Sequence, residues 1–404
     1  MDYSCTVQTL NLQMHILWLA SWYPDLYEGK NGDFVQRHAR AFARLNPVQV
    51  IHVVQAGYQV PASKDSHSNQ EPGMSELTGS FKYKPWGITW LDKLRYNLKY
   101  QLFYMRIFKE YVQHYGIPDL IHVHAPMKAG IIALRICKQL KIPFLITDHS
   151  SLYDPKATDS FDKRSWYFKK QLRKLYKNAA GYTNVSEAMA KSVKSLFNTG
   201  PIAIVRNVVQ ADLFFYKPPP KNSVFRWIHV STLYPLKNVL KILEAFQLLN
   251  SIRQDWQLVI VGGNYQELET AIQETPIQHL VFFTGELDYA AVAKQLQTSA
   301  AMVMFSKHEN FPCTIIEALC CGVPVVASDV GGVSEAVNSS NGILVESENT
   351  GALVTALEKM MIQSAGFDRR KISDTAAAAY GETVIAGQFL DLYNRVLQTH
   401  THNI

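Results

Sequence analysis

Short apolar runs alternate along the chain with longer stretches in which apolar residues recur every three or four positions. A short apolar run bounded by turn residues is typical of a buried strand, whereas the longer periodic stretches are typical of amphipathic helices. The predicted strands are residues 14–20, 48–54, 119–124, 143–147, 202–205, 225–231, 257–262, 280–284, 301–305, 324–327 and 342–345. The predicted helices are residues 34–45, 93–115, 128–140, 186–197, 237–251, 286–298, 351–362 and 382–399. This alternation predicts an α/β protein with parallel sheets that helices cover on both faces.

A run of three prolines at 218–220 interrupts the alternation, because consecutive prolines continue neither a helix nor a central strand. The chain length of 404 residues also favours two domains. The predicted division is an N-terminal Rossmann-like domain at 1–217, a linker at 218–221, a C-terminal Rossmann-like domain at 222–381 and a final helix at 382–404 that packs back on the N-terminal domain. Residues 1–13 are interpreted as a loose extension, with Met14 as an alternative start, and residues 56–80 as a surface excursion rich in Ser, Gly, Pro and Asn.

The composition narrows the class of protein. Hydrophobic residues make up 47% and charged residues 18% of the chain, an ordinary globular balance that excludes a mainly disordered protein. The five cysteines show no C-x-x-C spacing, which favours reduced thiols in the cytoplasm over a zinc site or a disulfide framework. No metal site is predicted, because no Asp-x-Asp sequence occurs and His122 and His124 are expected on opposite faces of their strand. No apolar run approaches the ~18 residues that cross a bilayer.

The net charge of +6 is modest, but basic and aromatic residues are interleaved over 163–177. Such a segment usually forms a solvated helix face. The alternative is peripheral contact with an anionic membrane, while nucleic acid is not expected because no recognition motif accompanies the charge. The expected location is therefore the cytoplasm, with the inner face of the membrane as the alternative.

A group of polar residues follows the predicted strand at 301–305. Glu309 lies in a loop, Asn310 is a good N-cap, and Pro312 suits the first turn of the next helix. Glu317 comes about five residues into that helix, roughly 7–8 Å along its axis. The free N–H groups of the first turn lie between the two carboxylates and, with the helix dipole, form an anion site.

The alternative interpretation of Glu309 and Glu317 is a solvated loop residue and a helix-surface residue. Against it, Glu317 is flanked by Ile316 and Ala318, and burying a carboxylate without a partner is costly. A predicted strand and the pair Gly331-Gly332 follow, and paired glycines permit the close approach of backbone to a ligand.

Residues 306–335 together resemble the donor-binding signature of the GT-B glycosyltransferases of the retaining family 4, the glycosyl transferases group 1. The resemblance rests on the Glu309-x7-Glu317 spacing, on the helix that leads to Gly322-Val323-Pro324-Val325-Val326, and on Gly331-Gly332 followed by Glu335. It extends over about residues 14–400. It implies two Rossmann-like domains that face a central cleft, with the acceptor on the N-terminal side and the nucleotide sugar on the C-terminal side.

The resemblance also implies the roles of individual residues. The catalytic residues it implies are Glu309 beside the hydroxyls of the donor sugar, His149 beside the sugar from the other domain, and Lys237 beside the diphosphate. The donor-binding residues it implies are Glu317 at the ribose, Gly32, Asn310, Phe311, Pro312, Gly285, Leu287, Thr232 and Arg206. The family often has an arginine at the position of Thr232. The missing charge is expected from Lys237 with backbone donors, or from Arg206 or Lys307.

The function implied by this resemblance is that of a retaining, metal-independent hexosyltransferase that needs no cofactor. It would move a sugar from a UDP- or GDP-linked donor to a glycan or lipid-linked acceptor in cell-surface polysaccharide synthesis. Two alternatives stay open. One is a catalytically silent partner subunit that binds a nucleotide sugar, which the departure at Thr232 favours. The other is a nucleotide-sugar epimerase of the same architecture, although such enzymes are usually richer in catalytic acids.

Overall fold

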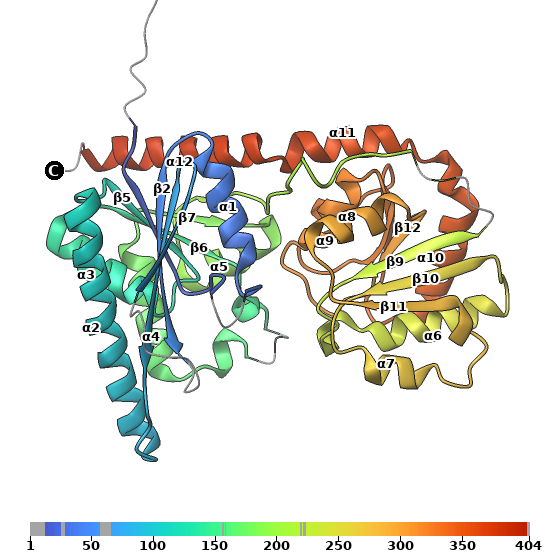
Figure 1. Cartoon of the computed structure of the whole chain (residues 1–404), viewed down its shortest axis with the longest axis horizontal. Coiled ribbons are helices and arrows are strands. Elements are labelled where there is room, and N and C mark those ends of the chain that lie inside the picture. Colours follow the sequence, from blue (N-terminus) through green and yellow to red (C-terminus); the bar gives the residue numbers. More distant parts are fainter. Residues whose placement is uncertain are drawn as a thin grey trace, which may run out of the picture. The chain divides into compact units, whose positions relative to one another are not determined.

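The computed structural model describes residues 13–25, 29–56, 66–155, 157, 159–218, 220 and 224–401 (Figure 1). The chain divides into two compact units, one of residues Met1–Ile146 with Leu390–Ile404 and one of residues Thr147–Phe389. Residues 1–12 of the predicted extension at 1–13, and Pro219 and Lys221 of the predicted linker, lie outside the described residues. The domain boundaries derived from the sequence stay predictions.

The first unit is built on a mainly parallel sheet. Its strands are β1 (Ile16–Ala20), β2 (Val48–Ala56), β3 (Ser66–Glu71), β4 (Met74–Lys82), β5 (Leu120–His124) and the beginning of β6 (Phe144–Asp148). They follow the order β3-β4-β2-β1-β5-β6, with β1 paired parallel to β2 and β5. Every residue of β1 and β5 is buried, as expected for strands covered on both faces.

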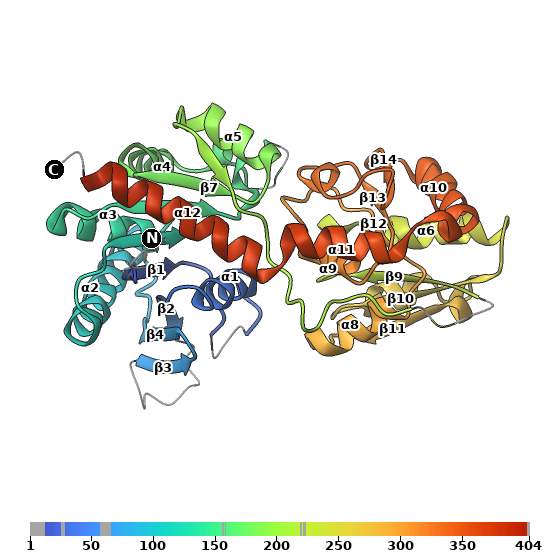
Figure 2. The ribbon, with the colours of Figure 1, turned by 90° about the horizontal axis from the view of Figure 1, so that it is seen from above.

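Helices cover this sheet, and a late segment of the chain completes the unit (Figure 2). They are α1 (Asp33–Ala43), α2 (Thr89–Tyr115), α3 (Ala129–Leu140) and the part of α12 (Glu382–Thr401) that begins at Leu390. On α12, the ring of Tyr393 packs edge-on against Phe42 at 5.1 Å between centroids. The Tyr393 hydroxyl lies 2.7 Å from Nδ1 of His122, so the helix is fixed to both the sheet and α1.

The interpretation of residues 56–80 as a surface excursion is wrong for the part that the structure describes, whereas residues 57–65 lie outside it. β3 and β4 form an antiparallel hairpin, and β4 pairs parallel with β2 from Val48↔Met74 to Ala56↔Lys82. The pattern misleads because two of the four buried positions of β4, Glu76 and Gly79, are polar or small. The carboxylate of Glu76 accepts a hydrogen bond from the Tyr23 hydroxyl at 2.5 Å. A β-carbon on Gly79 would lie 2.7 Å from the ring of Phe103.

The expectation that His122 and His124 point to opposite faces is also wrong. Their rings lie 4.1 Å apart between centroids, because residues two apart in a strand share a face. Trp18 packs against both rings, at 5.3 Å from His122 and 4.2 Å from His124. Burial lowers the pKa of His122 to about 3, so its ring is neutral at pH 7. Within the described residues, no group of three or more His, Cys, Asp or Glu side chains is placed to hold a metal ion.

The second unit contains a six-stranded sheet in which every strand pairing is parallel. Its strands are β9 (Phe225–Val230), β10 (Trp256–Val261), β11 (Val281–Gly285), β12 (Ala301–Met304), β13 (Val325–Ser328) and β14 (Gly342–Val345). The order β11-β10-β9-β12-β13-β14 is the doubly wound order 3-2-1-4-5-6 of Rossmann sheets. This confirms the α/β fold class predicted from the hydrophobic pattern.

Helices of the second unit flank this sheet and the shorter strands β7 (Gly181–Asn184) and β8 (Ile202–Ile204), which pair parallel. The helices are α4 (Trp166–Asn178), α5 (Glu187–Phe197), α6 (Val239–Asn250), α7 (Gln266–Ala271), α8 (Tyr289–Gln297), α9 (Cys313–Cys320), α10 (Thr350–Gln363) and α11 (Arg369–Tyr380), followed by the start of α12. One core cluster joins α6 and α10 to the sheet around Trp227, Phe246 and Trp256. α11 runs beside α9 (Figure 2).

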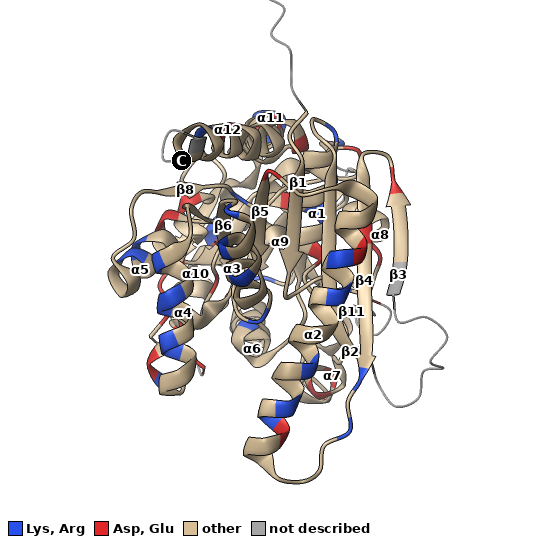
Figure 3. Ribbon diagram, turned by 90° about the vertical axis from the view of Figure 1, so that its left-hand side faces the viewer, with Lys and Arg blue, Asp and Glu red and all other residues tan. Residues whose placement is uncertain are grey.

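Helix α2 stands out in the first unit by its length and its charge. It is 27 residues long, and Lys and Arg recur along its outer side (Figure 3). None of the helices in the described part of the chain combines the length and apolarity needed to span a bilayer.

Candidate functional site

The carboxyl ends of β9 and β12 are neighbours in the second unit. β9 pairs with β10 on one side and with β12 on the other, which is the point where the strand order reverses. In sheets of this order, ligands bind beyond the carboxyl ends of the strands at this switch point. The loop after β9 carries Thr232 and Lys237, and the loop after β12 carries Glu309, Asn310 and Pro312. Two segments predicted to bind a donor therefore leave the sheet from neighbouring strands.

Lys237 and Glu309 contact each other directly. Nζ of Lys237 donates a hydrogen bond to Oε1 of Glu309 at 2.6 Å. The Glu309 side chain is 8% exposed and that of Lys237 is 23% exposed. The N–H of Lys307 also donates to the carbonyl oxygen of Leu236 at 2.8 Å, which joins the two loops. The structure thus brings two of the predicted catalytic residues together in surroundings where electrostatic interactions are stronger than in water.

A buried histidine fixes the loop that carries Lys237. Nδ1 of His229 lies 2.9 Å from the carbonyl oxygen of Val303, and its Nε2 lies 2.8 Å from Oγ of Ser231. The N–H of Leu233 donates to the same Oγ at 3.0 Å. Burial, opposed by the hydrogen bond to Val303, lowers the pKa of His229 to about 4, so the ring is neutral at pH 7. His229 is not identified from the sequence, because one histidine in an apolar strand carries no signal of its own.

Two glycines hold the loop that carries Glu309. Gly331 has a φ of +54°, and a β-carbon there would lie 1.6 Å from the carbonyl oxygen of Glu309. A β-carbon on Gly332 would lie 2.3 Å from the carbonyl oxygen of Asn310, which accepts the N–H of Gly332 at 3.1 Å. The space that a side chain at either position would need is therefore filled by the loop that carries Glu309 and Asn310.

The prediction that Asn310 caps the following helix is wrong. Helix α9 begins at Cys313, and Pro312 occupies the N-cap position. The side-chain N–H of Asn310 instead donates to the carbonyl oxygen of His149 at 2.7 Å. The Asn310 Oδ1 lies 3.1 Å from Nε2 of His308. These contacts lie within the second unit and bring a predicted donor-binding residue to a predicted catalytic one.

Glu317 lies inside α9 as its fifth residue, as predicted, and its side chain is buried. Because Glu317 is only 2% exposed, its interpretation as a helix-surface residue is excluded. Burial and then the Glu317 charge raise the pKa of the Cys320 thiol to about 12. Phe311, ahead of the helix, is also buried, and its carbonyl oxygen accepts the side-chain N–H of Asn207 at 2.6 Å.

His149 follows directly on the buried carboxylate of Asp148 at the end of β6. Oδ1 of Asp148 accepts the N–H of His149 at 2.7 Å and that of Ser150 at 2.9 Å, and its Oδ2 accepts the Tyr153 hydroxyl. Burial raises the pKa of Asp148 above its usual range. The backbone at His149 is thus fixed on one side by Asp148 and on the other by Asn310.

A pocket of about 310 Å³ in the second unit contains part of this arrangement. Its lining residues are Tyr153, Asp154, Pro155, Ser186, Ala188, Met189, Ser192, Lys307, His308, Glu309, Asn310, Asp329, Val330 and Gly331. Nδ1 of His308 contacts Oδ2 of Asp154 on this lining. Glu309 and Asn310 therefore line a cavity together with His308 and Gly331.

The cations expected to replace the missing arginine have other partners. Arg206 forms an ion pair with Glu335 at 3.3 Å and lies over the ring of Phe311 at 5.2 Å. Lys307 pairs with Glu348 at 3.4 Å, and both side chains are exposed. Thr232 itself is exposed.

Glu335 caps the N-terminus of α5, a structural role that the sequence motif does not indicate. Its carboxylate accepts the N–H groups of Glu187 and Ala188 at 3.0 Å each, in the first turn of α5. The side chain of Ser186 caps the same helix by accepting the N–H of Met189 at 3.2 Å. A carboxylate at a helix N-terminus is favoured by the helix dipole. Glu335 and Ala188 are 147 positions apart, so no local sequence pattern indicates their contact.

Gly285, Leu287 and Gly32, which are predicted to bind the donor, are not among the residues that line the pocket with Glu309. Gly285 ends β11 with a φ of +72°, and its carbonyl oxygen accepts the N–H of Gly262 at 3.0 Å. Leu287 follows two residues later and is half-buried. Gly32 belongs to the first unit, where it precedes α1 with a φ of +67°, and a β-carbon there would lie 2.5 Å from the backbone of Trp22.

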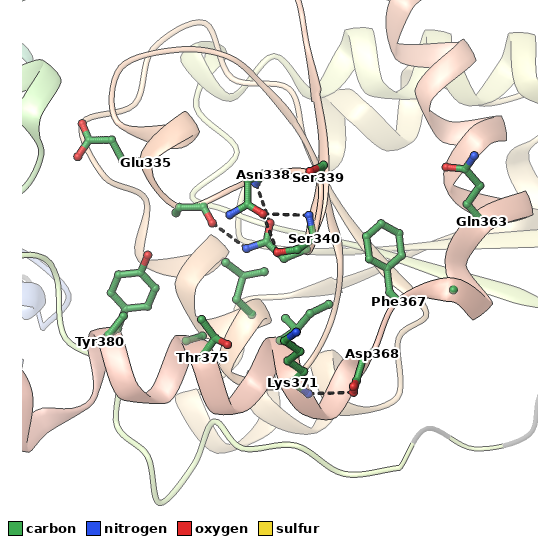
Figure 4. Close-up of a pocket in the computed structure, with 17 residues that line it drawn as sticks. Glu335, Asn338, Ser339, Ser340, Gln363, Phe367, Asp368, Lys371, Thr375 and Tyr380 are labelled. Carbon is green, nitrogen blue, oxygen red and sulfur yellow. Dashed lines mark hydrogen bonds between the residues drawn. The ribbon is translucent and has the colours of Figure 1, made fainter.

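A larger pocket of about 630 Å³ lies between α11 and the segment 336–341 (Figure 4). Asn338, Ser340 and Asn341 bond to one another on its wall, and Phe367 and Tyr380 stand at separate positions along it. None of Lys237, Glu309 and His149 lines it. Of these three residues, Glu309 lines the smaller pocket, and the other two contact its lining residues: Lys237 contacts Glu309, and His149 contacts Asn310. The candidate site is therefore the smaller pocket together with Lys237 and His149.

Both halves of the chain match known protein families. Residues 32–213 match the model of Glycosyltransferase Family 4, and residues 214–378 match that of the glycosyl transferases group 1. Among curated proteins, the Bacillus subtilis glycosyltransferase TuaC, named for teichuronic acid biosynthesis, is 24% identical over 366 residues, which are 86% of this chain and 89% of TuaC.

Solved structures of the same fold cover nearly the whole chain. Sucrose-phosphate synthase from Thermosynechococcus elongatus superposes with a TM-score of 0.76 at 20% identity, over 95% of this chain and 100% of that one. The Anabaena protein HepE in complex with UDP superposes with a TM-score of 0.70 at 17% identity, with the same coverage. The two family matches in series and the fold they share identify the chain as a member of the GT-B glycosyltransferases of family 4.

Proposed function

We propose that this protein transfers a hexosyl group from a nucleotide-diphosphate sugar to an acceptor hydroxyl with retention of the anomeric configuration. The observation that carries the proposal is the contact of 2.6 Å between Lys237 and Glu309, at the carboxyl ends of the two strands that flank the switch point. A cation for the diphosphate and a carboxylate for the sugar hydroxyls lie next to each other there. Donor binding separates the two charges, because each gains a partner of its own from the donor.

Each residue of the site then has a defined task in the transfer. Lys237 neutralises the charge that develops on the leaving diphosphate, a task that a divalent metal performs in other transferases. Glu309 accepts hydrogen bonds from hydroxyls of the donor sugar, and Glu317 from hydroxyls of the ribose. His149 positions the sugar. The acceptor oxygen bonds to the anomeric carbon as the bond from that carbon to the diphosphate breaks, and the leaving phosphate oxygen takes the proton of the acceptor hydroxyl. The acceptor oxygen is therefore the nucleophile, and no side chain is assigned that role.

The donor and the acceptor are proposed at the level of chemical class. The UDP bound to the similar protein HepE supports a UDP-linked donor, with a GDP-linked donor as the alternative. The name of TuaC refers to the biosynthesis of a polysaccharide, which supports a glycan or lipid-linked acceptor in cell-surface polysaccharide synthesis. Both assignments are testable independently of the mechanism.

A thermal-shift screen against UDP, GDP and their common hexose conjugates, with and without EDTA, tests donor binding without metal. We expect the unfolding temperature to rise with one nucleotide, equally with and without the chelator. The rise should disappear in Lys237→Ala and persist in Lys241→Ala, whose exposed lysine pairs with Glu244. A rise that EDTA abolishes would contradict the metal-independent site.

Incubation of the selected donor with an alkyl glycoside acceptor then separates transfer from the two alternatives. Proton NMR of the product should show the anomeric configuration of the donor. An altered donor sugar formed without any acceptor indicates an epimerase. Nucleotide binding with no turnover on any acceptor tried indicates the silent partner subunit.

A further inference from the structure

Helix α2 exposes an apolar stripe to solvent. Trp90, Leu94, Leu98 and Leu102 follow one another at intervals of four residues, with exposed fractions of 68%, 62%, 57% and 62%. Residues at this spacing lie on one face of a helix. Buried residues form the opposite face, namely Tyr100, Tyr104, Ile107, Phe108 and Tyr111. The helix therefore has one apolar face packed on its own sheet and a second apolar face in contact with water.

The turn that precedes α2 extends this stripe with further large apolar side chains. Trp86 is 67% exposed and Ile88 is 48% exposed. The carboxylate of Asp92 accepts the N–H of Trp86 at 2.7 Å and that of Gly87 at 2.9 Å, and so closes the turn against the helix. Trp86 is thus presented by a fixed turn, which projects with the first turns of α2 beyond the strands of the unit (Figure 1).

Basic residues border the stripe. A hollow of about 730 Å³ between the strand end at Lys82 and α2 is lined by Lys82, Tyr83, Lys84, Pro85, Trp86, Arg95, Leu98, Lys99 and Leu102. Among these described lining residues four are cationic and none is acidic. The Arg95 guanidinium also lies 3.2 Å from the centre of the Trp86 ring. Blue positions along α2 in Figure 3 show the same charge continuing up the helix.

We propose that the stripe on α2 and its basic border form a docking surface for an anionic lipid bilayer, on which the helix lies flat. Large exposed apolar patches mark interaction surfaces. Tryptophan suits the interface between headgroups and acyl chains, and a helix with leucines on one face and cations beside them inserts at that depth. The positive border matches the negative headgroups by charge. The helix itself does not reach the apolarity of a membrane-spanning segment.

The segment 163–177, for which the sequence leaves membrane contact as the alternative to a solvated helix face, has a different surface. In α4 the apolar residues Leu172, Leu175 and Tyr176 are buried against the protein. Trp166 and Tyr167 are exposed at its start. This segment offers charge with two aromatic residues and no continuous apolar stripe, and so it provides a control for the α2 surface.

Co-sedimentation of the full chain with vesicles tests the proposal. Phosphatidylcholine vesicles with and without 30% phosphatidylglycerol serve as anionic and neutral surfaces. We expect the protein to partition at least tenfold more strongly to the anionic vesicles, with the preference falling as salt rises. The variant Leu94→Gln/Leu98→Gln/Leu102→Gln should partition at least tenfold more weakly. Because these side chains are exposed, its circular dichroism and unfolding temperature should match those of the wild type.

Matched variants and a second measurement make the outcomes decisive. Trp166→Ser/Tyr167→Ser on α4 and Ile362→Gln on α10 replace exposed apolar residues elsewhere and should leave partitioning unchanged. Failure of the wild type to bind anionic vesicles, equal binding to neutral ones, or loss of binding in the α4 variant instead of the α2 variant overturns the proposal. A wild-type dimer in solution that the α2 variant dissociates would assign the stripe to a second copy of the chain.

Discussion

The carbonyl oxygen of Glu309 lies where a side chain on Gly331 would begin, only 1.6 Å from the position of a β-carbon. Glycine is therefore required at 331 by both the space and the φ of +54°. The backbone of the loop that carries Glu309 cannot keep its path if residue 331 has a side chain. The glycine at 331 thus allows the loop of Glu309 to pack closely, and the position of the Glu309 carboxylate depends on that packing.

Gly331→Ala is expected to lower turnover at least tenfold and to destabilise the second unit by roughly 1–2 kcal/mol, because an L-residue in the left-handed region is strained and its methyl group displaces Glu309. Steady-state kinetics and thermal unfolding measure both effects. Gly387→Ala is the matched control, since no atom lies within 4 Å of a β-carbon there and helix α12 should gain stability. Wild-type turnover in Gly331→Ala would show that the loop position is not needed.

Glu309→Ala is expected to lower kcat about 10²–10³-fold while nucleotide affinity stays within a few fold, because the carboxylate acts on the sugar. Lys237→Ala should lower both kcat and nucleotide affinity, because the ammonium acts on the diphosphate. Isothermal titration with the nucleotide and single-turnover kinetics separate the two. Equal losses of affinity in both variants would contradict the assigned division of tasks.

Acidification is expected to destabilise the protein as the pH falls from about 6.5 towards 4. The pKa of His229 is about 4 in the folded state and near 6.5 when unfolded, so over this interval the unfolded state binds the extra proton. The loss reaches roughly 3 kcal/mol at 1.36 kcal/mol per pKa unit. Buried His122, with a pKa of about 3, acts in the same direction.

Thermal unfolding between pH 4 and pH 7.5 measures this dependence. His229→Asn should show a shallower fall in unfolding temperature below pH 6.5, from a lower starting value at pH 7. His114→Asn is the control, because that histidine is exposed at the end of α2. Identical pH profiles in wild type and His229→Asn would remove His229 as the source.

Glu335→Ala is expected to destabilise the second unit by roughly 1–3 kcal/mol, because two N–H groups of α5 and the guanidinium of Arg206 lose their acceptor. Glu335→Gln should lose less, since an amide oxygen still accepts one N–H. Chemical unfolding followed by tryptophan fluorescence reports the change. Asp374→Ala removes an exposed pair with Arg370 and should change little.

The sequence predicts the sheets better than it predicts the contacts at their ends. β9, β10, β12 and β13 are recognised because apolar residues make up most of each strand. β7 and the whole of α11 are missed, because Gly181-Tyr182-Thr183-Asn184 is not apolar and α11 begins with Arg369-Arg370-Lys371, which shows no apolar face. Family resemblance points to Lys237 and Glu309 separately. Their contact spans 72 positions and depends on two neighbouring strands, which no local pattern records.

The same limit explains the errors around Asn310. Local propensity favours it as an N-cap, yet its side chain bonds to His149, 161 positions away. Tertiary contact here overrides the local preference. The glycine pair indicates a close approach of backbone, but the sequence does not identify the Glu309 and Asn310 backbone that approaches it.

The loop of Glu309 is held by backbone contacts, which leaves the side chains next to Glu309 free to vary among related proteins. The contacts that fix it run through backbone atoms of Glu309 and Asn310 against Gly331 and Gly332. Side chains at 307 and 308 point to other partners, Glu348 and Asp154, and take no part in that contact. Substitution at these two positions can therefore alter what the neighbouring pocket accepts while the carboxylate keeps its place. Within one loop, the side chains at 307 and 308 can change with the ligand, whereas the backbone at Glu309 and Asn310 keeps the carboxylate in position.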